Sequence, residues 1–339
     1  MDKKRLFIWP VIAVVILTAA FVFGRTNRGD ATFQRDEGFI FGTIYEITYQ
    51  NEENLNNEIL ETLNKVNMSL SPFEKNSIIS HINRNKKVAT DSMFNYVFNM
   101  AMTVSRQTGG AFDITIAPLV NAWGFGFKQG TGVDSATIDS LRQFIGYKKV
   151  SLNGNSVEKA DSRTMLDCSA IAKGYGCDAV AELLDSKGIG NYMINIGGEI
   201  VVKGMSPKNK EWKIGVNKPV EDSLSQNDEI LTVLNLSNTA MATSGNYRNV
   251  YYRNGKKYAH TIDPRIGYPV QHSLLSATVI AKKCALADAY ATSFMVMGLE
   301  EAKAFGQKHP EIEAYFIYSG EDGSYRTYFT PSLKKKIAD

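Results

Sequence analysis

The chain has 339 residues, of which 44% are hydrophobic and 22% are charged, and its formal net charge is +3. This composition is that of a globular protein with a substantial core, and it excludes a disordered chain. The small net charge gives no electrostatic argument for nucleic-acid binding. Cys168, Cys177 and Cys284 lack CxxC spacing and nearby histidine pairs, which argues against a zinc or thioredoxin-type centre. We therefore expect the cysteines to be small core residues.

The N-terminal segment, residues 1–24, has the pattern of a transmembrane anchor or a signal sequence. Basic residues at positions 3–5 precede an apolar run over residues 6–23, which is just long enough to span a bilayer. The positive charges predict a cytoplasmic amino terminus, with the rest of the chain on the periplasmic or outer side of the cytoplasmic membrane. A cleaved signal peptide is the alternative, although no small-x-small cleavage site follows. Residues 25–37 are polar and lack periodicity, which predicts a linker.

Strand and helix patterns alternate through the first half of the folded part. Alternating β-branched and aromatic residues predict a strand over residues 38–49, interrupted at Gly42 by a bulge or a close approach. Apolar residues at helical spacing predict helices over residues 55–70 and 91–107. Residues 110–126 combine an acid with aromatic residues and glycines. That composition is found in pockets for planar ligands, and equally in ordinary core and turns.

Residues 166–178 are the most informative stretch, because a strand end runs there directly into a helix. We expect Ser169 to cap that helix, so that the amides of residues 170–172 point outward at the positive end of the helix dipole. Such a site binds phosphate, and Lys173 adds a positive charge on the first turn. Gly174 and Gly176 cost roughly 1 kcal/mol each in helix propensity, which indicates a bulky group close to the backbone. The alternative is an amphipathic helix whose glycines let another element pack closely.

Beyond this helix the sequence predicts mainly strands and then one long helix. Residues 192–203 favour two strands or one bent strand, and further strands are expected at 212–216, 231–236 and 249–252, with a hairpin turn at Asn254-Gly255. Residues 241–247 are too small and polar for a core strand. The last long helix is expected over residues 286–297. We therefore predict an α+β fold with mostly antiparallel sheets, forming one unit over residues 38–330, before a solvated basic tail over residues 331–339.

Asp288 and Thr292 lie four residues apart on the last helix and therefore share one face. A carboxylate and a hydroxyl, joined by a main-chain carbonyl from elsewhere, form the all-oxygen ligand set that a hard cation such as Mg²⁺ prefers. The spacing is frequent by chance, so this pattern alone is a weak signal for a metal site.

In combination, the motifs resemble those of the ApbE-type FAD:protein FMN transferases, a family of flavin transferases. The resemblance runs from Gly38 to about Lys308. Its motifs, in chain order, are Phe41-Gly-Thr43, Ser69-x-x-x-Phe73, Gly109-Gly-Ala-Phe-Asp-Ile-Thr115, Pro118-Leu119, Trp123-Gly-Phe-Gly126, Leu166-Asp167, Ala172-Lys-Gly-Tyr-Gly-x-Asp178, Ile196-Gly-Gly-Glu199, Thr243-Ser-Gly-Asn-Tyr247, His260-x-Ile-Asp-Pro-Arg-x-Gly267, Ala287-Asp288 and Ala291-Thr292. The resemblance implies a T-fold-like single catalytic unit.

The resemblance also implies an activity and a set of site residues. The enzyme would split the pyrophosphate of FAD in a Mg²⁺-dependent reaction, transfer FMN through its phosphate to a threonine hydroxyl of an acceptor flavoprotein, and release AMP. The implied magnesium ligands are Asp288, Thr292 and a main-chain oxygen at Ala170. Lys173 would hold the phosphates, and Asp167 would accept a hydrogen bond from the nucleotide. The other positions that match the FAD site are Phe41, Phe73, Ala111, Phe112, Asp113 and Ile262.

Transfer to a threonine requires a base, and His260 has the appropriate ordinary pKa for that role. Asp263 is a second candidate, and His260 could equally cap its turn or stack on the flavin. The chain departs from the family pattern at Phe41, where relatives often carry methionine, and at Cys168-Ser169, where a Leu-Gly pair is more common. Neither departure affects Asp288, Thr292 or Lys173.

Two other functions are compatible with the same residues. Attack by water in place of threonine would make the protein a Mg²⁺-dependent FAD pyrophosphatase that gives FMN and AMP. A membrane-tethered module that binds flavin without chemistry is the second alternative, although binding alone hardly requires a cation at the diphosphate. Electron-transfer subunits at the outer face of the cytoplasmic membrane are the acceptors that the resemblance implies.

Overall fold

The computed structural model describes residues 32–127, 133–220, 229–247, 250–253 and 256–338. The predicted anchor, most of the linker and the predicted turn at Asn254-Gly255 lie outside these residues. Within the described ranges, no helix is both long and apolar enough to cross a membrane.

The helices and strands of the described residues include the helices predicted over residues 55–70, 91–107 and 286–297, together with elements that the sequence analysis did not predict. In chain order they are β1 (Phe33–Ile40), β2 (Thr43–Gln50), α2 (Asn56–Leu70), α3 (Ile78–Asn83), α4 (Ser92–Gln107), α5 (Ala117–Ala122), α6 (Ser135–Arg142), η1 (Tyr147–Lys149), β3 (Val150–Asn153), β4 (Ser156–Lys159), α7 (Ala172–Ser186), β5 (Tyr192–Ile196), β6 (Glu199–Lys203), β7 (Trp212–Asn217), β8 (Ile230–Leu236), β9 (Thr239–Gly245), β10 (Val250–Arg253), β11 (Lys256–Ala259), β12 (Ile262–Asp263), β13 (Tyr268–Pro269), β14 (Leu274–Ala281), α8 (Cys284–Met297), α9 (Leu299–Lys308), β15 (Glu313–Ser319), β16 (Tyr325–Phe329) and η2 (Leu333–Lys336).

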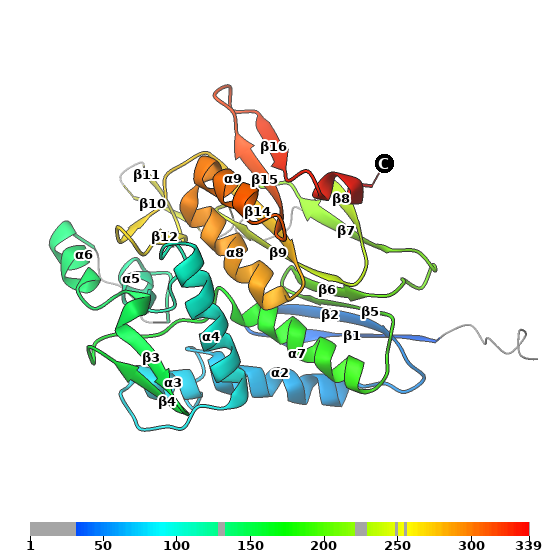
Figure 1. The fold of residues 1–339 in the computed structure, drawn as a ribbon, viewed down its shortest axis with the longest axis horizontal. Coiled ribbons are helices and arrows are strands. Elements are labelled where there is room, and N and C mark those ends of the chain that lie inside the picture. Colours follow the sequence, from blue (N-terminus) through cyan, green and yellow to red (C-terminus); the bar gives the residue numbers. More distant parts are fainter. Residues whose placement is uncertain (1–31, 128–132, 221–228, 248–249, 254–255, 339) are drawn as a thin grey trace, which may run out of the picture.

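An eight-stranded antiparallel sheet in the order β1-β2-β5-β6-β9-β14-β15-β16 forms the centre of the molecule (Figure 1). Alternation along each strand sends one set of side chains to each face. On β2, for example, Tyr45, Ile47 and Tyr49 are buried, whereas the residues between them are partly exposed. The α+β fold with mostly antiparallel strands is therefore confirmed.

Helices cover one face of the sheet, and a hairpin covers part of the other. Helices α2 and α7 pack on β2 and β5, and α8 lies against β9 and β14 between α7, α4 and α9 (Figure 1). The hairpin of β7 and β8 packs its buried residues, among them Trp212 and Leu234, on the opposite face of β6, β9 and β15. Helix α8 is consequently apolar nearly all round, as expected for a helix with no solvent face.

The first hairpin differs from the expected interrupted strand. Residues 41 and 42 form a two-residue turn between β1 and β2, and both have positive φ, 53° at Phe41 and 76° at Gly42. Residues 33–37, which were expected to belong to the linker, are part of β1. The polar residue Asp36 fits within that strand because its carboxylate accepts hydrogen bonds from the Tyr49 hydroxyl and the Asn54 amide, each at 2.7 Å.

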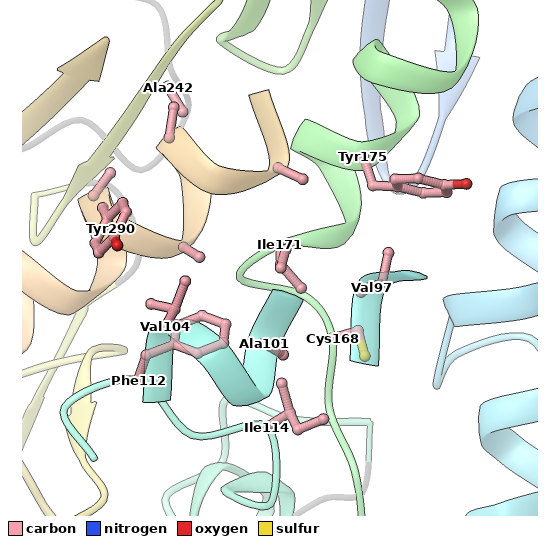
Figure 2. Packing of buried hydrophobic residues seen from close by; sticks show 14 of the residues in the cluster. Val97, Ala101, Val104, Phe112, Ile114, Cys168, Ile171, Tyr175, Ala242 and Tyr290 are labelled. Atoms are coloured by element: carbon pink, nitrogen blue, oxygen red, sulfur yellow. The ribbon is translucent and has the colours of Figure 1, made fainter. Parts of the chain in front are cut away.

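Strand β9 corrects the expectation that residues 241–247 are too small and polar for the core. It lies in the centre of the sheet between β6 and β14. Ala242 is fully buried on the side of α8, and Met241 is buried on the side of β7 and β8. Small side chains are needed here because α8 packs directly on this strand, and Figure 2 shows Ala242 close to the α8 ribbon. The low hydrophobicity of β9 is therefore a consequence of its close packing against α8, and the strand is not exposed to solvent.

The C-terminal residues are packed, in contrast to the expected solvated tail. The side chain of Leu333 is fully buried, and the main-chain amide of Ala338 donates to the Val233 carbonyl oxygen at 2.8 Å. The Lys336 ammonium lies 2.6 Å from the Glu313 carboxylate. The expectation for the cysteines is confirmed, because all three are free thiols in the core.

Candidate active site

A cavity of about 880 Å³ lies where the turn of the first hairpin, the start of α7, the middle of α8 and the His260 turn meet. This volume is in the range of pockets that bind cofactor-sized ligands. The site residues that the resemblance implies, together with the candidate base His260, all line it: Phe41, Phe73, Ala111, Phe112, Asp113, Asp167, Ala170, Lys173, His260, Ile262, Asp288 and Thr292. The fold thus gathers residues that are up to 251 positions apart, from 41 to 292, around one space.

Helices α7 and α8 are held together at this cavity by two reciprocal contacts. Asp288 on α8 accepts a hydrogen bond from the amide of Gly174 on α7 at 3.1 Å. In return, the Asp178 carboxylate of α7 accepts from the amides of Cys284 and Ala285, at 2.9 and 3.0 Å, and so caps the start of α8. Each carboxylate thereby satisfies main-chain donors that would otherwise be buried without partners.

Gly174 permits this approach. A Cβ atom at position 174 would lie 2.4 Å from the carbonyl oxygen of Cys284 and 2.8 Å from Cα of Ala285. At Gly176, a Cβ atom would lie 2.6 Å from the ring of Phe41. The bulky groups close to Gly174 and Gly176 are therefore the backbone of α8 and the Phe41 side chain of the first hairpin. This result agrees with the alternative interpretation, in which the glycines let another element pack closely on the helix.

The start of α7 differs from the predicted phosphate site. Ser169 does not cap the helix, which begins at Ala172 after Ile171. The amides of Ile171 and Ala172 both donate to the carbonyl oxygen of Cys168, at 3.0 and 2.8 Å, so they do not point outward as free donors. The physical reason is a turn before the helix, in which Asp167 accepts from the Ser169 amide at 2.8 Å. Figure 2 shows Ile171 on this segment, close to Ala101 of α4.

Lys173 forms an ion pair inside the cavity wall. Its ammonium lies 2.5 Å from Oε1 of Glu199, whose side chain is 3% exposed, at the start of β6. Burial acts to lower the pKa of Lys173, but the carboxylates of Glu199 and Asp288 outweigh it, so the pKa is raised and the ammonium stays charged. Lys173 is therefore a fixed positive charge at the cavity, as the sequence predicts.

Glu199 belongs to the Ile196-Gly-Gly-Glu199 motif, but the sequence analysis assigned it no role in the site. It lines the cavity, and its second oxygen, Oε2, is buried with no hydrogen-bond partner within the part of the chain that the structure describes. A buried carboxylate oxygen without a partner is costly, and it marks a position where a ligand or ion is expected. The available signal was a carboxylate directly after Gly197 and Gly198 at the start of an otherwise apolar strand.

The oxygen atoms at this end of the cavity fit a hard cation. Asp288 is 4% exposed, and Thr292, one turn further along α8, also lines the cavity. Burial raises the pKa of Asp288, while the Lys173 ammonium and the Gly174 amide act in the opposite direction. The described residues contain no group of three or more His, Cys, Asp or Glu side chains suited to a metal ion. Asp288, Thr292 and the main chain of Ala170 offer carboxylate, hydroxyl and main-chain oxygens to this cavity, a donor set of the type that suits Mg²⁺.

Another part of the cavity lining is aromatic and apolar. Phe112 and Ile262 are each 3% exposed and form its walls, whereas Phe73 is 66% exposed at the rim, edge-on to Phe127. The Trp123 indole donates to the Gly267 carbonyl oxygen at 2.9 Å, which ties the segment that carries Ile262 to the helix α5 region. Such walls suit a planar ring system.

Asp113 has a structural task in addition to its place in the cavity lining. One of its oxygens accepts from the amide and the hydroxyl of Thr115, at 2.8 and 2.6 Å, and the other accepts from the Tyr147 amide at 2.6 Å. Burial raises its pKa, and these hydrogen bonds oppose the shift. Asp113 therefore holds the cavity loop against the segment before β3.

His260 and Asp263 have different environments, although both belong to the same turn. His260 lines the cavity, with its ring edge-on to Phe125 at a centroid distance of 6.4 Å. Asp263 does not line it; both of its oxygens are bound by the guanidinium of Arg265, at 3.0 and 2.9 Å. The structure therefore favours His260 over Asp263 as the candidate base, because the Asp263 carboxylate is already held in a bidentate ion pair.

Comparison with known proteins agrees with this geometry. The sequence model of the ApbE family matches residues 41–316. The FAD:protein FMN transferase of Vibrio cholerae is 35% identical over 308 residues, which cover 88% of this chain and 90% of that protein. The enzyme of the same name from Escherichia coli K12 is 29% identical over 345 residues, covering 95% and 96%.

The solved structures that resemble this fold are also ApbE flavin transferases. The flavin transferase ApbE from Vibrio cholerae superposes with a TM-score of 0.81 at 33% identity, covering 90% of this chain and 99% of that one. The apo form of the flavinyl transferase ApbE from Pseudomonas stutzeri superposes with a TM-score of 0.79 at 28% identity, covering 90% and 96%.

Proposed function

The chain belongs to the ApbE family and is an FAD:protein FMN transferase, and we propose that it transfers FMN from FAD to a threonine hydroxyl of an acceptor flavoprotein in a Mg²⁺-dependent reaction. The hydroxyl oxygen of the acceptor forms a bond to the phosphorus of the FMN moiety. The bond from that phosphorus to the bridging oxygen breaks, and AMP leaves with the bridging oxygen. The observation that carries the proposal is the contact between Asp288 and Gly174, which places the middle of α8 and the start of α7 on one cavity.

The polar end of the cavity is the site for the diphosphate. Asp288, Thr292 and the main-chain oxygen of Ala170 would hold the magnesium ion, which when bound neutralises charge on the phosphoryl oxygens and the leaving group. Lys173 contributes a fixed positive charge to the same diphosphate, because its ion pair with Glu199 holds its ammonium at the cavity wall. Asp167 accepts a hydrogen bond from the nucleotide. The main-chain amide of Ser169 donates to the Asp167 carboxylate and so fixes its orientation.

The apolar end is the site for the flavin ring. Phe41 lies in the hairpin turn, Phe112 and Ile262 are in the cavity walls, and Phe73 is at the rim. Together with Ala111 and the loop that Asp113 holds, these side chains enclose a planar ligand and exclude water from its ring.

His260 is the proposed general base. It lines the cavity, and it would take the proton from the acceptor hydroxyl as that oxygen attacks the phosphorus. Exclusion of water from this space favours attack by the acceptor hydroxyl over attack by water. Attack by water would hydrolyse FAD, which is the alternative outcome of the same chemistry.

We further propose a location at the cytoplasmic membrane, with the catalytic unit on its periplasmic or outer side. The apolar run over residues 6–23 and the basic residues before it support an uncleaved anchor. Electron-transfer flavoproteins of that membrane are the proposed acceptors. Fractionation of cells that express the full chain tests the location, and a soluble, shortened form would contradict it.

The function is tested by incubating the full chain with FAD, Mg²⁺ and a candidate acceptor flavoprotein. Flavin fluorescence that stays on the acceptor in a denaturing gel, together with release of AMP, is the expected result. Free FMN would indicate a pyrophosphatase, and intact FAD would indicate a binding module. An acceptor in which the modified threonine is replaced by alanine must remain unlabelled.

A further inference from the structure

Three charged side chains meet at the polar end of the cavity: Lys173 on α7, Glu199 on β6 and Asp288 on α8. Lys173 forms its ion pair with Glu199 at 2.5 Å, while Asp288 accepts from the Gly174 amide. Lys173 is also close enough to Asp288 for the two charges to interact. One ammonium thus has two carboxylates within its reach and is held by one of them.

The choice of partner matters for the cation site. Glu199 and Asp288 are 2% and 4% exposed, so water screens their charges poorly and each carboxylate strongly attracts a cation. If the Lys173 ammonium moved to Asp288, it would occupy the carboxylate that the proposed magnesium site requires. A lysine ammonium and a divalent ion cannot both take the same oxygens without strong repulsion.

We propose that Glu199 is a positioning residue that holds the Lys173 ammonium away from Asp288 and so keeps the Asp288 carboxylate available to a divalent cation. The ion pair with Glu199 also keeps the lysine at the wall, where it faces the diphosphate. This assignment rests on the proposed function, because it presumes the cation site at Asp288 and Thr292.

The fold supports this division of tasks. Glu199 is the first residue of β6 and follows a turn with positive φ at both glycines, 67° at Gly197 and 102° at Gly198, so its backbone position is fixed by the hairpin. Lys173 is on the first turn of α7, whose close packing on α8 is fixed by Gly174. Removing Glu199 would leave the Lys173 ammonium, whose side chain is 30% exposed, without its partner, and Asp288 is the carboxylate nearby that would replace it.

The test is Mn²⁺ binding by the full chain without FAD, measured by electron paramagnetic resonance. The variants are Glu199→Gln, Lys173→Met and the double variant. We expect Glu199→Gln to weaken Mn²⁺ binding by about ten-fold, because the ammonium then pairs with Asp288. The double variant is expected to bind Mn²⁺ within about three-fold of the unaltered chain, because the competing ammonium is gone.

The matched control is Glu58→Gln. Glu58 pairs with Lys187 at 3.1 Å beyond the other end of α7, away from the cavity, so its loss should leave Mn²⁺ binding unchanged. Thermal unfolding followed by circular dichroism establishes that each variant is folded.

Two results would overturn the inference while the proposed function stands. Unchanged Mn²⁺ binding by Glu199→Gln would show that Glu199 does not protect Asp288. Equally weak binding by Glu199→Gln and the double variant would make Glu199 a direct ligand and not a positioning residue. No Mn²⁺ binding by the unaltered chain would instead overturn the proposed cation site, and this inference with it.

Discussion

The amide of Gly174 on α7 donates a hydrogen bond to the carboxylate of Asp288 on α8, with 3.1 Å between nitrogen and oxygen. The two residues are far apart in the sequence, yet the contact joins the elements that carry Lys173 and Thr292. It also orients Asp288 in an otherwise apolar helix, where a charged side chain requires a partner. The catalytic assignments depend on this contact.

Replacing Asp288 by asparagine should remove most of the transfer activity. The side chain keeps its size, but the negative charge that attracts the cation is lost, and we expect a fall in kcat of at least about 100-fold. The measurement is the rate of AMP release with saturating FAD and acceptor. Asp139→Asn on α6, where the side chain is 72% exposed in an ion pair with Arg142, is the matched control and should retain full activity. Equal rates for the two variants would contradict the role of Asp288.

His260→Ala should bind FAD normally and lose most transfer. A positioned general base contributes about 10² to 10⁴ in rate, so a loss in that range is expected. FAD affinity is measured by fluorescence titration and transfer by in-gel fluorescence. His309→Ala is the control, because His309 stacks on Phe305 and does not line the cavity. Unchanged transfer by His260→Ala would exclude the residue from the mechanism.

Gly174→Ala should destabilise the protein through one steric contact. The added Cβ would lie 2.4 Å from the Cys284 carbonyl oxygen, and backbone atoms cannot move aside as a flexible side chain can. We expect a loss of about 1–3 kcal/mol in the free energy of unfolding, measured by urea denaturation. Gly190→Ala is the control: a Cβ there meets no atom within 4 Å, so a change below about 1 kcal/mol is expected. Similar values for both variants would show that the packing around position 174 accommodates the added methyl group.

Asp178 should make stability depend on pH. Burial raises its pKa to about 6 from the ordinary value of 3.8, although the amides of Ala285 and Cys284 oppose the shift. The folded state therefore holds the proton more tightly than the unfolded state does. The contribution of Asp178 to stability is greatest below about pH 4 and falls as the pH rises to about 6.

The measurement is urea unfolding of the unaltered chain and of Asp178→Ala at several pH values between about 4 and 7. The difference in the free energy of unfolding should fall by up to about 3 kcal/mol across that interval. A difference that stays constant with pH would mean that the carboxylate keeps its ordinary pKa in the folded protein.

Local patterns were sufficient for many elements of the fold. Helical spacing of apolar residues predicted α2 and α4, and Asp91 caps α4 through the amide of Phe94 at 2.7 Å. Strand alternation predicted β2, β5 and β6 of the large sheet and the hairpin of β7 and β8, whereas β14, β15 and β16 were not predicted. These predictions succeed because periodicity and capping depend on neighbours in the sequence.

Local patterns failed where packing decides the structure. Strand β9 was rejected for its small residues, which are there because α8 lies directly on the strand. Ser169 was expected to cap α7. Instead, the residues before the helix form a turn, in which Asp167 and the carbonyl oxygen of Cys168 accept hydrogen bonds from main-chain amides. In both cases the physical cause is a contact that the local composition does not reveal.

The sequence by itself determined the residue types of the site, their order along the chain and the elements that carry them, because motifs and periodicity are properties of neighbouring positions. Only the tertiary structure decided which of them act together. It placed Glu199 beside Lys173, bound Asp263 to Arg265 and left Asp288 facing the cavity. These outcomes depend on charges and shapes from separate elements, whose distances are fixed when the sheet and its helices pack.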